Sequence, residues 1–244
     1  MKSVRVLVTR PRDDADELTV ELERRGHHAA QMPLLDIRYL NDVDLHLDRV
    51  QAVLLTSANG ARALSHVAED RHDLAIFAVG DATAQAARSA GFLRVSSAGG
   101  DVAALAGRVV RELYPAAGPL VHVGGRQVAG DLAGSLREHG FTVGRVVLYE
   151  AIAAERIDPV VEVELRERRV DAVLFFSART AATFVALVQQ TDLANACTSI
   201  DAVCLSDAVA EEITVLAWHR VKIAARADQP SLLDALDSGA LSAS

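Results

Sequence analysis

The feature that most constrains this chain is an internal repeat, in which a pattern of strand, turn, helix, glycine and strand occurs twice. The two copies align without gaps when 114 is added to the numbering of the first copy. The aligned pairs are Leu18 with Leu132, Leu22 with Leu136, Gly26 with Gly140, Arg12 with Arg126, and Asp36 with Glu150. Each copy ends in an extended stretch, residues 33–39 and residues 146–152. A unit that is used twice predicts two similar domains.

The segments between the two copies repeat as well. At an offset of 120, residues 52–54 match residues 172–174, and Ser57-Ala58 matches Ser177-Ala178. Further on, residues 79–82 match 205–208 and residues 101–105 match 228–232. The second block lacks its own first strand and helix, which the amino-terminal copy can supply. We therefore expect a discontinuous domain of residues 1–34 with 153–244, an inserted domain of residues 42–145, and linker strands at residues 35–41 and 146–152.

Short apolar runs alternate with amphipathic stretches, and this alternation predicts α/β domains. Residues 4–8 and 52–56 are typical of buried strands, and Ala15, Leu18 and Leu22 then follow at helical spacing. Such alternation gives mostly parallel sheets flanked by helices. We expect two similar domains of this kind, joined by a two-stranded linker. Residues 154–169 are expected to form a charged helix, and the closing LSAS an unstructured tail.

Composition and charge exclude several classes of protein. The net charge is -8, and Lys and Arg are scattered singly, so no basic stripe is available for nucleic acid. No apolar run approaches the roughly 20 residues of a membrane span, and the amino terminus has no secretory apolar segment. Cys197 and Cys204 fit neither a metal spacing nor a disulfide framework, so both are expected to be reduced packing residues. We expect a cytoplasmic monomer that contacts neither membrane nor nucleic acid.

Ligands of parallel α/β sheets lie beyond the carboxyl ends of the strands, where helix amino termini present backbone N–H groups. Small residues in these turns let the amides approach an anionic ligand. The candidate binding residues are Thr9, Arg10, Thr56, Ser57, Ala58, Gly80, Thr83, Arg126, Ser177, Ala178, Arg179 and Ser206. The same residue types also cap helices without binding anything, and that alternative stays open.

Most familiar catalytic and nucleotide-binding signatures are missing. The glycines at 124, 125 and 130 are not in the GxGxxG register, and no glycine precedes Lys-Ser or Lys-Thr. No GxSxG turn occurs. Eight histidines invite a metal hypothesis, but His27 and His28 are neighbours on a predicted strand and point to opposite faces, while the others are dispersed. We predict no metal site.

Tyr149 is the candidate catalytic residue. It is one of three tyrosines and lies on the second linker strand, where we expect a cleft between the two domains. Its phenol could donate a hydrogen bond to a leaving oxygen. The alternative is an aromatic ring that only packs against its surroundings, because a buried tyrosine usually finds some hydrogen bond anyway.

Several motifs are spread along the chain. They are the opening strand with Thr-Arg-Pro at residues 6–11, the Thr-Ser-Ala-Asn turn at 56–59, the Val-Gly-x-x-Thr-Ala turn at 79–84, the strand with its tyrosine at 146–149, the Phe-x-Ser turn at 175–177, and the strand at 221–224 followed by Pro-Ser-Leu-Leu at 230–233. Taken together, these motifs resemble the uroporphyrinogen-III synthase family over essentially the whole chain. The resemblance implies two α/β domains joined by a two-stranded linker.

The resemblance also implies a reaction. The substrate would be hydroxymethylbilane, a linear tetrapyrrole with eight carboxylates, which a lyase closes to uroporphyrinogen III with loss of water and inversion of the last ring. Such an enzyme of haem biosynthesis needs no metal or organic cofactor. Tyr149 would donate to the departing hydroxyl, and Thr83 with the amides of Ser57, Ala58 and Gly80 would contact carboxylates and rings. Arg10, Arg126 and Arg179 would be further carboxylate partners.

The chain departs from the family pattern at one turn. Where a second Gly-x-x-Thr turn is expected, it has Ser206-Asp207-Ala208-Val209, without the glycine and the threonine hydroxyl. This departure leaves room for a second hypothesis, a non-catalytic two-lobed relative that binds a tetrapyrrole or regulates. A third, a flavodoxin-like nucleotide binder, predicts flavin absorbance in the purified protein.

Overall fold

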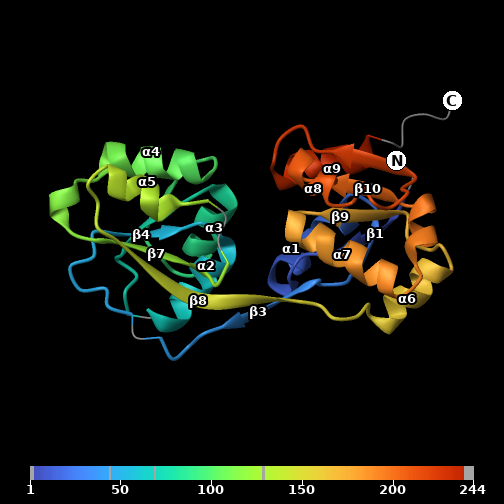
Figure 1. Cartoon of the computed structure of the whole chain (residues 1–244), viewed down its shortest axis with the longest axis horizontal. Helices are drawn as coiled ribbons and strands as arrows, with labels where there is room; N and C mark the ends of the chain where they lie inside the picture. The colour runs from blue at the N-terminus through green and yellow to red at the C-terminus, as the bar shows by residue number, and fades with distance from the viewer. Residues whose placement is uncertain (1–2, 44, 69, 128–129, 239–244) are drawn as a thin grey trace. The chain divides into compact units, whose positions relative to one another are not determined.

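The computed structural model describes residues 3–43, 45–68, 70–127 and 130–238 (Figure 1). The closing LSAS, expected to be a tail, lies outside these residues. By its internal contacts the chain divides into two compact units. Unit 1 is Met1–Asp36 with Ile152–Ser244, and unit 2 is Ile37–Ala151. The domain limits expected from the sequence stay a prediction, because a division by contacts does not show which segment folds on its own.

Unit 1 is built on a five-stranded sheet of order β11-β10-β9-β1-β2, in which all strands are parallel. Since β1 pairs with β9, the amino-terminal strand lies inside a sheet whose other side comes from the carboxy-terminal part of the chain. The strands are β1 Arg5–Val8, β2 His28–Gln31, β9 Ala172–Phe175, β10 Asp201–Cys204 and β11 Arg220–Ile223. The helices are α1 Arg12–Arg24, α6 Pro159–Arg166, α7 Ala178–Gln190, α8 Asp207–Glu211 and α9 Gln229–Asp237, with a 3₁₀ helix at Ala194–Ser199.

Unit 2 contains the other sheet, of order β3-β8-β7-β4-β5-β6. Its strands are β3 Leu35–Tyr39, β4 Ala52–Leu55, β5 Ala75–Ala78, β6 Arg94–Ser97, β7 Leu120–Gly125 and β8 Val143–Ala153. Its helices are α2 Ala58–Val67, α3 Asp81–Ser89, α4 Val102–Glu112 and α5 Leu132–Glu138, with a 3₁₀ helix at Pro115–Ala117. The five strands β8, β7, β4, β5 and β6 are parallel to one another. The expected α/β class with mostly parallel sheets is confirmed.

Strands β3 and β8 carry the chain between the two units. The amide of Leu40 donates to the carbonyl of Leu148 at 2.8 Å, and the amide of Ala154 donates to the carbonyl of Leu34 at 2.9 Å. Ascending numbers on one strand therefore meet descending numbers on the other, which is antiparallel pairing. The two extended stretches that end the sequence repeat thus lie side by side.

The repeat extends to the register of the strands. In unit 1, Val6 is opposite Ala172 and Val8 is opposite Leu174. The residues of unit 2 that match these in the repeat lie 114 positions after the β1 residues and 120 positions before the β9 residues. They make the same pairs, Leu120 with Ala52 and His122 with Leu54. The central strands of the two sheets thus pair in the same register, so their residues can be compared directly.

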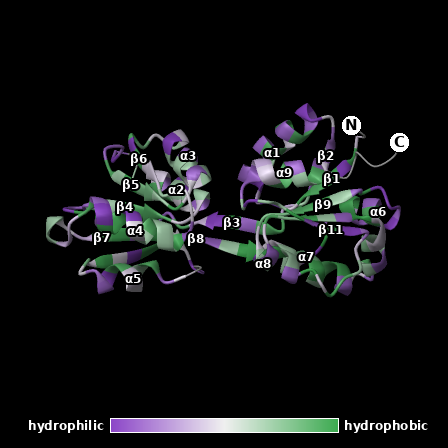
Figure 2. Ribbon diagram, turned by 90° about the horizontal axis from the view of Figure 1, so that it is seen from above, coloured by the Kyte–Doolittle hydropathy of each residue, from purple (hydrophilic) through white to green (hydrophobic). Residues whose placement is uncertain are grey.

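Each sheet buries both of its faces under helices, as parallel sheets do. In unit 1, α6, α7 and α8 cover one face and α1 and α9 the other. In unit 2, α2 and α3 cover one face, and α4 and α5 cover the other. Strands β4 and β9 are buried along their whole length. Figure 2 shows hydrophobic residues gathered on inner strands such as β4 and β9, while hydrophobic and hydrophilic residues alternate along the helices.

The helix expected at residues 154–169 is wrong at both ends. Strand β8 continues to Ala153, and α6 spans only Pro159–Arg166. Asp158 caps it by accepting from the amide of Val160, and proline is favoured at a first helical position, so these two residues set its start. Among the described residues, no helix is long and apolar enough to cross a membrane.

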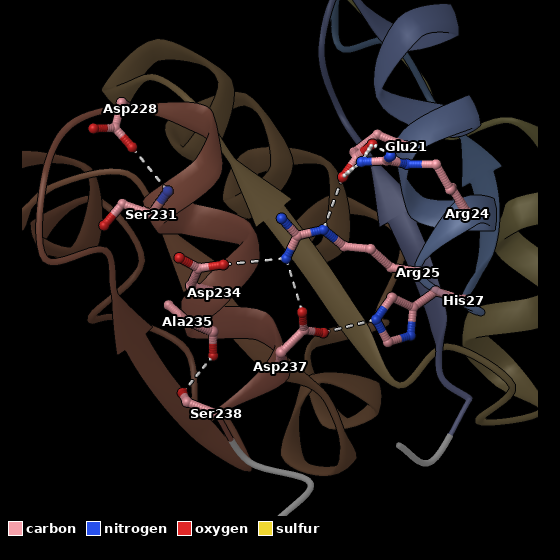
Figure 3. Close-up of polar contacts among 10 residues, drawn as sticks. All are labelled: Glu21, Arg24, Arg25, His27, Asp228, Ser231, Asp234, Ala235, Asp237 and Ser238. Atoms are coloured by element: carbon pink, nitrogen blue, oxygen red, sulfur yellow. Dashed lines mark hydrogen bonds and ion pairs between the residues drawn. The ribbon is translucent and has the colours of Figure 1, made fainter.

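A polar cluster attaches α9 to α1 at the amino edge of the unit 1 sheet (Figure 3). Arg25 donates from Nη1 to Asp237 at 2.9 Å and to Asp234 at 3.2 Å, and from Nε to Glu21 at 3.0 Å. His27 is 4% exposed, and its Nε2 lies 2.8 Å from Asp237 Oδ1. Its Nδ1 has no hydrogen-bond partner in the part of the chain that the structure describes. The cluster therefore ties the amino-terminal helix to the last described helix.

The two cysteines are free and buried, as expected. Burial raises the pKa of the Cys197 thiol to about 11 and that of Cys204 to about 12. Thiols with such pKa values stay protonated at neutral pH and are poor nucleophiles. Both act as small packing residues.

Candidate functional site

The carboxyl ends of β4, β5 and β7 lie at one edge of the unit 2 sheet, which we call the carboxyl edge of unit 2. Six expected site residues follow these strands directly or lie in the first turn of the next helix: Thr56, Ser57, Ala58, Gly80, Thr83 and Arg126. Because β4 lies between β5 and β7, their turns are neighbours. This edge also contains Tyr149, whose hydroxyl lies 2.8 Å from Ser57 Oγ.

Ser57 is held in place by its own helix. It is the N-cap of α2, with φ -155° and ψ 154°, and its Oγ accepts a hydrogen bond from the amide of Gly60 at 3.0 Å. An N-cap side chain bonded in this way has one rotamer, since the amide of the first turn fixes the oxygen. The hydroxyl of Tyr149 therefore meets an oxygen of fixed position.

A shift of strand register turns Tyr149 toward Ser57. Along β7 and β8, Gly124 is opposite Val147, but the next residue, Gly125, is opposite Tyr149, so Leu148 is an extra residue, as in a β-bulge. Side chains alternate between the faces of a strand, so without the shift Leu148 and Tyr149 would point to opposite faces. With it, both pack against the core that α2 covers.

Gly125 makes room for the tyrosine ring. A Cβ atom at this position would lie 2.8 Å from Cε2 and from Cζ of Tyr149 and 3.1 Å from its hydroxyl. Such contacts are too short for carbon atoms, so any other residue would displace the ring. The ring thus rests on the backbone at the end of β7, with its hydroxyl at the start of α2.

A buried histidine contacts Thr56, the residue before Ser57. His122, on β7, is 5% exposed, and its Nε2 is 3.2 Å from Thr56 Oγ1. Burial, together with the positive charge of Arg145 on the neighbouring strand, lowers the pKa of His122. The imidazole is therefore neutral at pH 7, and the tautomer decides whether His122 or Thr56 donates. Arg145 also donates to the carbonyls of Gly125 and Arg126 at 2.7 and 3.0 Å, which holds the end of β7.

The turn between β5 and α3 presents backbone rather than a capping side chain. Gly80 is the N-cap of α3, with extended φ -154° and ψ 176°. Thr83 is in the first turn of α3 and is 6% exposed. Within the described residues its hydroxyl makes no hydrogen bond that would explain its burial. This hydroxyl and the first amides of α3 are free to bind a ligand.

Arg126 is the most exposed of the expected site residues on this edge. Its guanidinium forms an ion pair with Glu150 on β8, and its side chain is 69% exposed. An exposed arginine already paired with a carboxylate can exchange that partner for a ligand carboxylate at little cost. The side chain is placed at the edge but not fixed toward a ligand.

In unit 1, the two expected residues after β1 are occupied by the protein itself. Thr9 is fully buried, and its hydroxyl donates to the carbonyl of Leu174 at 2.7 Å, joining β1 to β9. Arg10 donates to Gln229 at 2.9 Å, pairs with Asp14 at 3.1 Å, and lies 4.4 Å above the ring of Phe176. These contacts give both side chains a structural role, and their binding roles stay predictions.

The remaining expected residues of unit 1 begin its helices. Ser177 is the N-cap of α7, and its Oγ lies 2.6 Å from the hydroxyl of Thr180. Ala178 and Arg179 are the first residues of this helix, and all three are partly exposed. Ser206 is the N-cap of α8, but its side chain makes no capping bond. Its φ of -159° and ψ of 170° match those of Gly80, so the turn does not require glycine.

Sequence reasoning missed Gly125 and His122. No role of its own was predicted for Gly125, although a glycine that ends a buried strand is itself a sign of close approach. His122 interrupts the apolar run Leu-Val-His-Val, which marks a buried polar group that needs a partner. In the part of the chain that the structure describes, no group of three or more His, Cys, Asp or Glu residues could hold a metal ion.

The chain matches a known protein family over most of its length. The family described as uroporphyrinogen-III synthase HemD matches residues 16–234. No protein with a curated description is similar in sequence at a significant level.

Solved structures share the fold. The uroporphyrinogen-III synthetase from Helicobacter pylori matches with a TM-score of 0.64 and 14% identity, over 98% of this chain and 99% of that one. A mutant uroporphyrinogen III synthase from the extremely thermophilic bacterium Thermus thermophilus matches with a TM-score of 0.54 and 18% identity, over 98% of both chains. At such identities the likeness concerns the fold.

Proposed function

This chain belongs to the uroporphyrinogen-III synthase family, the cyclising lyases of haem biosynthesis, and from that premise we propose that Tyr149 on the carboxyl edge of unit 2 assists the loss of hydroxyl from hydroxymethylbilane. The function is that of the family: closure of the linear tetrapyrrole to uroporphyrinogen III with loss of water and inversion of the last ring. The observation that carries the assignment of Tyr149 is its 2.8 Å contact with the fixed oxygen of Ser57.

In this reaction the substrate supplies the electrons, so the main task of the protein is to position the substrate. As the C–O bond of the hydroxymethyl group breaks, a pyrrole nitrogen supplies the electrons, and the departing oxygen gains negative charge. A phenol that donates a hydrogen bond to this oxygen stabilises the charge as it develops. The last ring must then attack at its substituted carbon, and holding the chain in the correct conformation is the larger task.

Substrate carboxylates need donors, and unit 2 provides the strongest candidates. Thr83 is a buried residue whose hydroxyl has no partner among the described residues, and the amides of Ser57, Ala58 and Gly80 lie at helix amino termini. Arginine is the residue best suited to a carboxylate. We keep the remaining candidates as further substrate contacts: Arg126 and Thr56 in unit 2, and Thr9, Arg10, Ser177, Ala178, Arg179 and Ser206 in unit 1.

We further propose that the protein works as a cytoplasmic monomer that binds no nucleic acid. The support is a net charge of -8 with scattered Lys and Arg, which offers no stripe for phosphates. Light scattering coupled to size exclusion gives the mass directly, and a value near 26.0 kDa is expected. A mass of twice this value would show that the monomer assignment is wrong.

Product analysis tests the function. Freshly generated hydroxymethylbilane is supplied to the folded protein, the products are oxidised, and type I and type III porphyrins are separated by chromatography. Without enzyme the substrate closes to the type I isomer, so an excess of type III reports the inversion of the last ring. Type I alone, at the rate of the control, would leave the protein as a binder of tetrapyrroles.

A further inference from the structure

We propose that Ser57 and Gly125 are positioning residues for Tyr149: Gly125 seats the ring at the register shift of β7 and β8, and Ser57 sets the direction of the phenol proton. The proposal rests on the proposed role of Tyr149 and goes beyond it. Neither residue touches the reacting atoms in this assignment. Each acts through the tyrosine, and each acts on a different degree of freedom of that side chain.

Gly125 decides where the ring lies. The extra residue Leu148 brings Tyr149 to the face of the sheet under α2, but the ring fits there only because position 125 has no side chain. An added Cβ would lie 2.8 Å from two ring atoms, so the ring would have to shift. A methyl group at this position therefore moves the hydroxyl away from the start of α2.

Ser57 decides where the phenol proton points. One lone pair of Ser57 Oγ is used by the amide of Gly60, at 3.0 Å. The hydroxyl of Ser57 is then best satisfied by donating its own proton to the oxygen of Tyr149, 2.8 Å away. In that arrangement the phenol proton is left over, and it is free to be donated to a departing oxygen. Such a chain of hydrogen bonds also polarises the phenol.

Unit 1, which contains the first copy of the repeat, lacks this arrangement. At the offset of 114, Gly125 corresponds to Pro11 and Tyr149 to Leu35. The serine is kept at the offset of 120 as Ser177, and it also caps its helix, but its hydroxyl lies against Thr180. A capping role alone explains Ser177. The tyrosine contact of Ser57 is an addition to that role.

A double-mutant cycle tests Ser57. Ser57→Ala is expected to lower kcat about five- to tenfold with little change in KM, the size of one hydrogen bond. In a Tyr149→Phe background the same substitution should have no further effect on kcat. Asp101→Ala is the matched control, because Asp101 caps α4 of the same unit by the same kind of bond, to the amide of Ala104 at 2.9 Å. Both cap variants should lose similar stability, and only Ser57→Ala should lose turnover.

Gly125→Ala tests whether the Tyr149 ring needs the space left by the missing side chain at position 125. We expect at least a tenfold loss of kcat, with Gly144→Ala as the control, since a Cβ at Gly144 would meet only the carbonyl of Leu120, at 3.9 Å. Tyrosine labelled with ¹³C at Cζ gives a direct readout, because the chain has only three tyrosines. Ser57→Ala and Gly125→Ala should each shift one resonance, the one that Tyr149→Phe removes.

The outcomes separate this inference from the proposed function. If Tyr149→Phe turns over like the wild type, the role of Tyr149 itself is wrong. If Tyr149→Phe is slow but Ser57→Ala slows it further by its full single-mutant factor, Tyr149 acts without Ser57, and the positioning role fails alone. An unchanged tyrosine resonance in Gly125→Ala would equally overturn the role of Gly125.

Discussion

The five strands of unit 1 and five of the six strands of unit 2 pair in the same order and, apart from the shift between β7 and β8, in the same register, yet the two units differ at equivalent positions. At the amino edge of its sheet, unit 1 pairs His27 with Asp237. In unit 2 the residue that corresponds to His27, at the offset of 114, is Phe141. The residue that corresponds to Asp237 is Val110, at the offset of 127 that also aligns Asp228 with Asp101. At the carboxyl edge, His122 and Thr56 of unit 2 correspond to Val8 and Phe176 of unit 1. The shared architecture therefore accommodates either a polar or an apolar pair at the same position.

The connectivity accounts for the polar cluster at the amino edge. In unit 2, α4 and α5 follow one another closely in the chain, so packing alone keeps them together. In unit 1, the helices at the same places are α9 and α1, from opposite ends of the described chain. Closing a long loop costs more entropy than closing a short one. Arg25, His27 and Asp237 provide charged hydrogen bonds at the place where that entropy is lost.

The largest effect on stability is expected from breaking the cluster. Asp237→Val leaves both ring nitrogens of buried His27 without a partner, and should lower the free energy of unfolding by about 1–3 kcal/mol. The double variant His27→Phe/Asp237→Val installs the pair found in unit 2 and should recover most of the loss. Denaturant unfolding of the two variants and the wild type measures this. Equal losses in both would show that the pairs are not interchangeable.

A smaller effect is expected from exchanging the side chains of Thr83 in unit 2 and Val209, the residue at the equivalent turn of unit 1. Thr83→Val is expected to reduce kcat/KM about five- to tenfold, because it removes a ligand contact that the protein does not use itself. Steady-state kinetics with hydroxymethylbilane gives this value.

The reciprocal change, Val209→Thr, buries a new hydroxyl in the core of unit 1 and should lower stability by about 1 kcal/mol without raising activity. If Thr83→Val instead loses stability and keeps its activity, the Thr83 hydroxyl is a structural group.

The smallest effect at neutral pH is expected for His122→Val, which gives unit 2 the residue of unit 1. Because burial and Arg145 lower the pKa of His122, the unfolded chain binds the proton more readily than the native one. Below the ordinary histidine pKa of about 6.5, stability must fall as pH falls. The variant should lose less stability than the wild type between about pH 7 and pH 5 in thermal unfolding. Parallel stability curves for the two proteins would show that protonation of His122 does not cause the loss of stability at low pH.

The architecture could be predicted well because its determinants are local or periodic. Short apolar runs and helical spacing indicated parallel α/β sheets, and residues 101–105 and 228–232, which matched in sequence, both begin helices. The predicted length of α6 was wrong, because the helix starts only at Pro159, after its cap Asp158, although the charged stretch before it looks helical. The polar cluster could not be predicted, because its partners meet only after the chain ends have come together.

The sequence singled out candidate residues, whose roles stay predictions, but not the geometry that brings some of them together. Tyr149 and Ser57 were each singled out, but their contact depends on a register shift that leaves no trace in residue spacing. Thr9 shows the opposite case: its place at a strand end suggested a ligand contact, while its hydroxyl bonds a carbonyl of a strand far away in sequence. Pairings between distant segments decide which turn residues are left for a ligand.

The most direct test is the turnover of Tyr149→Phe compared with that of Tyr114→Phe, a control whose ring is exposed just before the 3₁₀ helix Pro115–Ala117. Steady-state kinetics with hydroxymethylbilane should show kcat for type III product reduced at least tenfold in Tyr149→Phe, with KM nearly unchanged and Tyr114→Phe like the wild type. A Tyr149→Phe enzyme that forms type III product at the wild-type rate would contradict the assignment of the chemistry to this edge of unit 2.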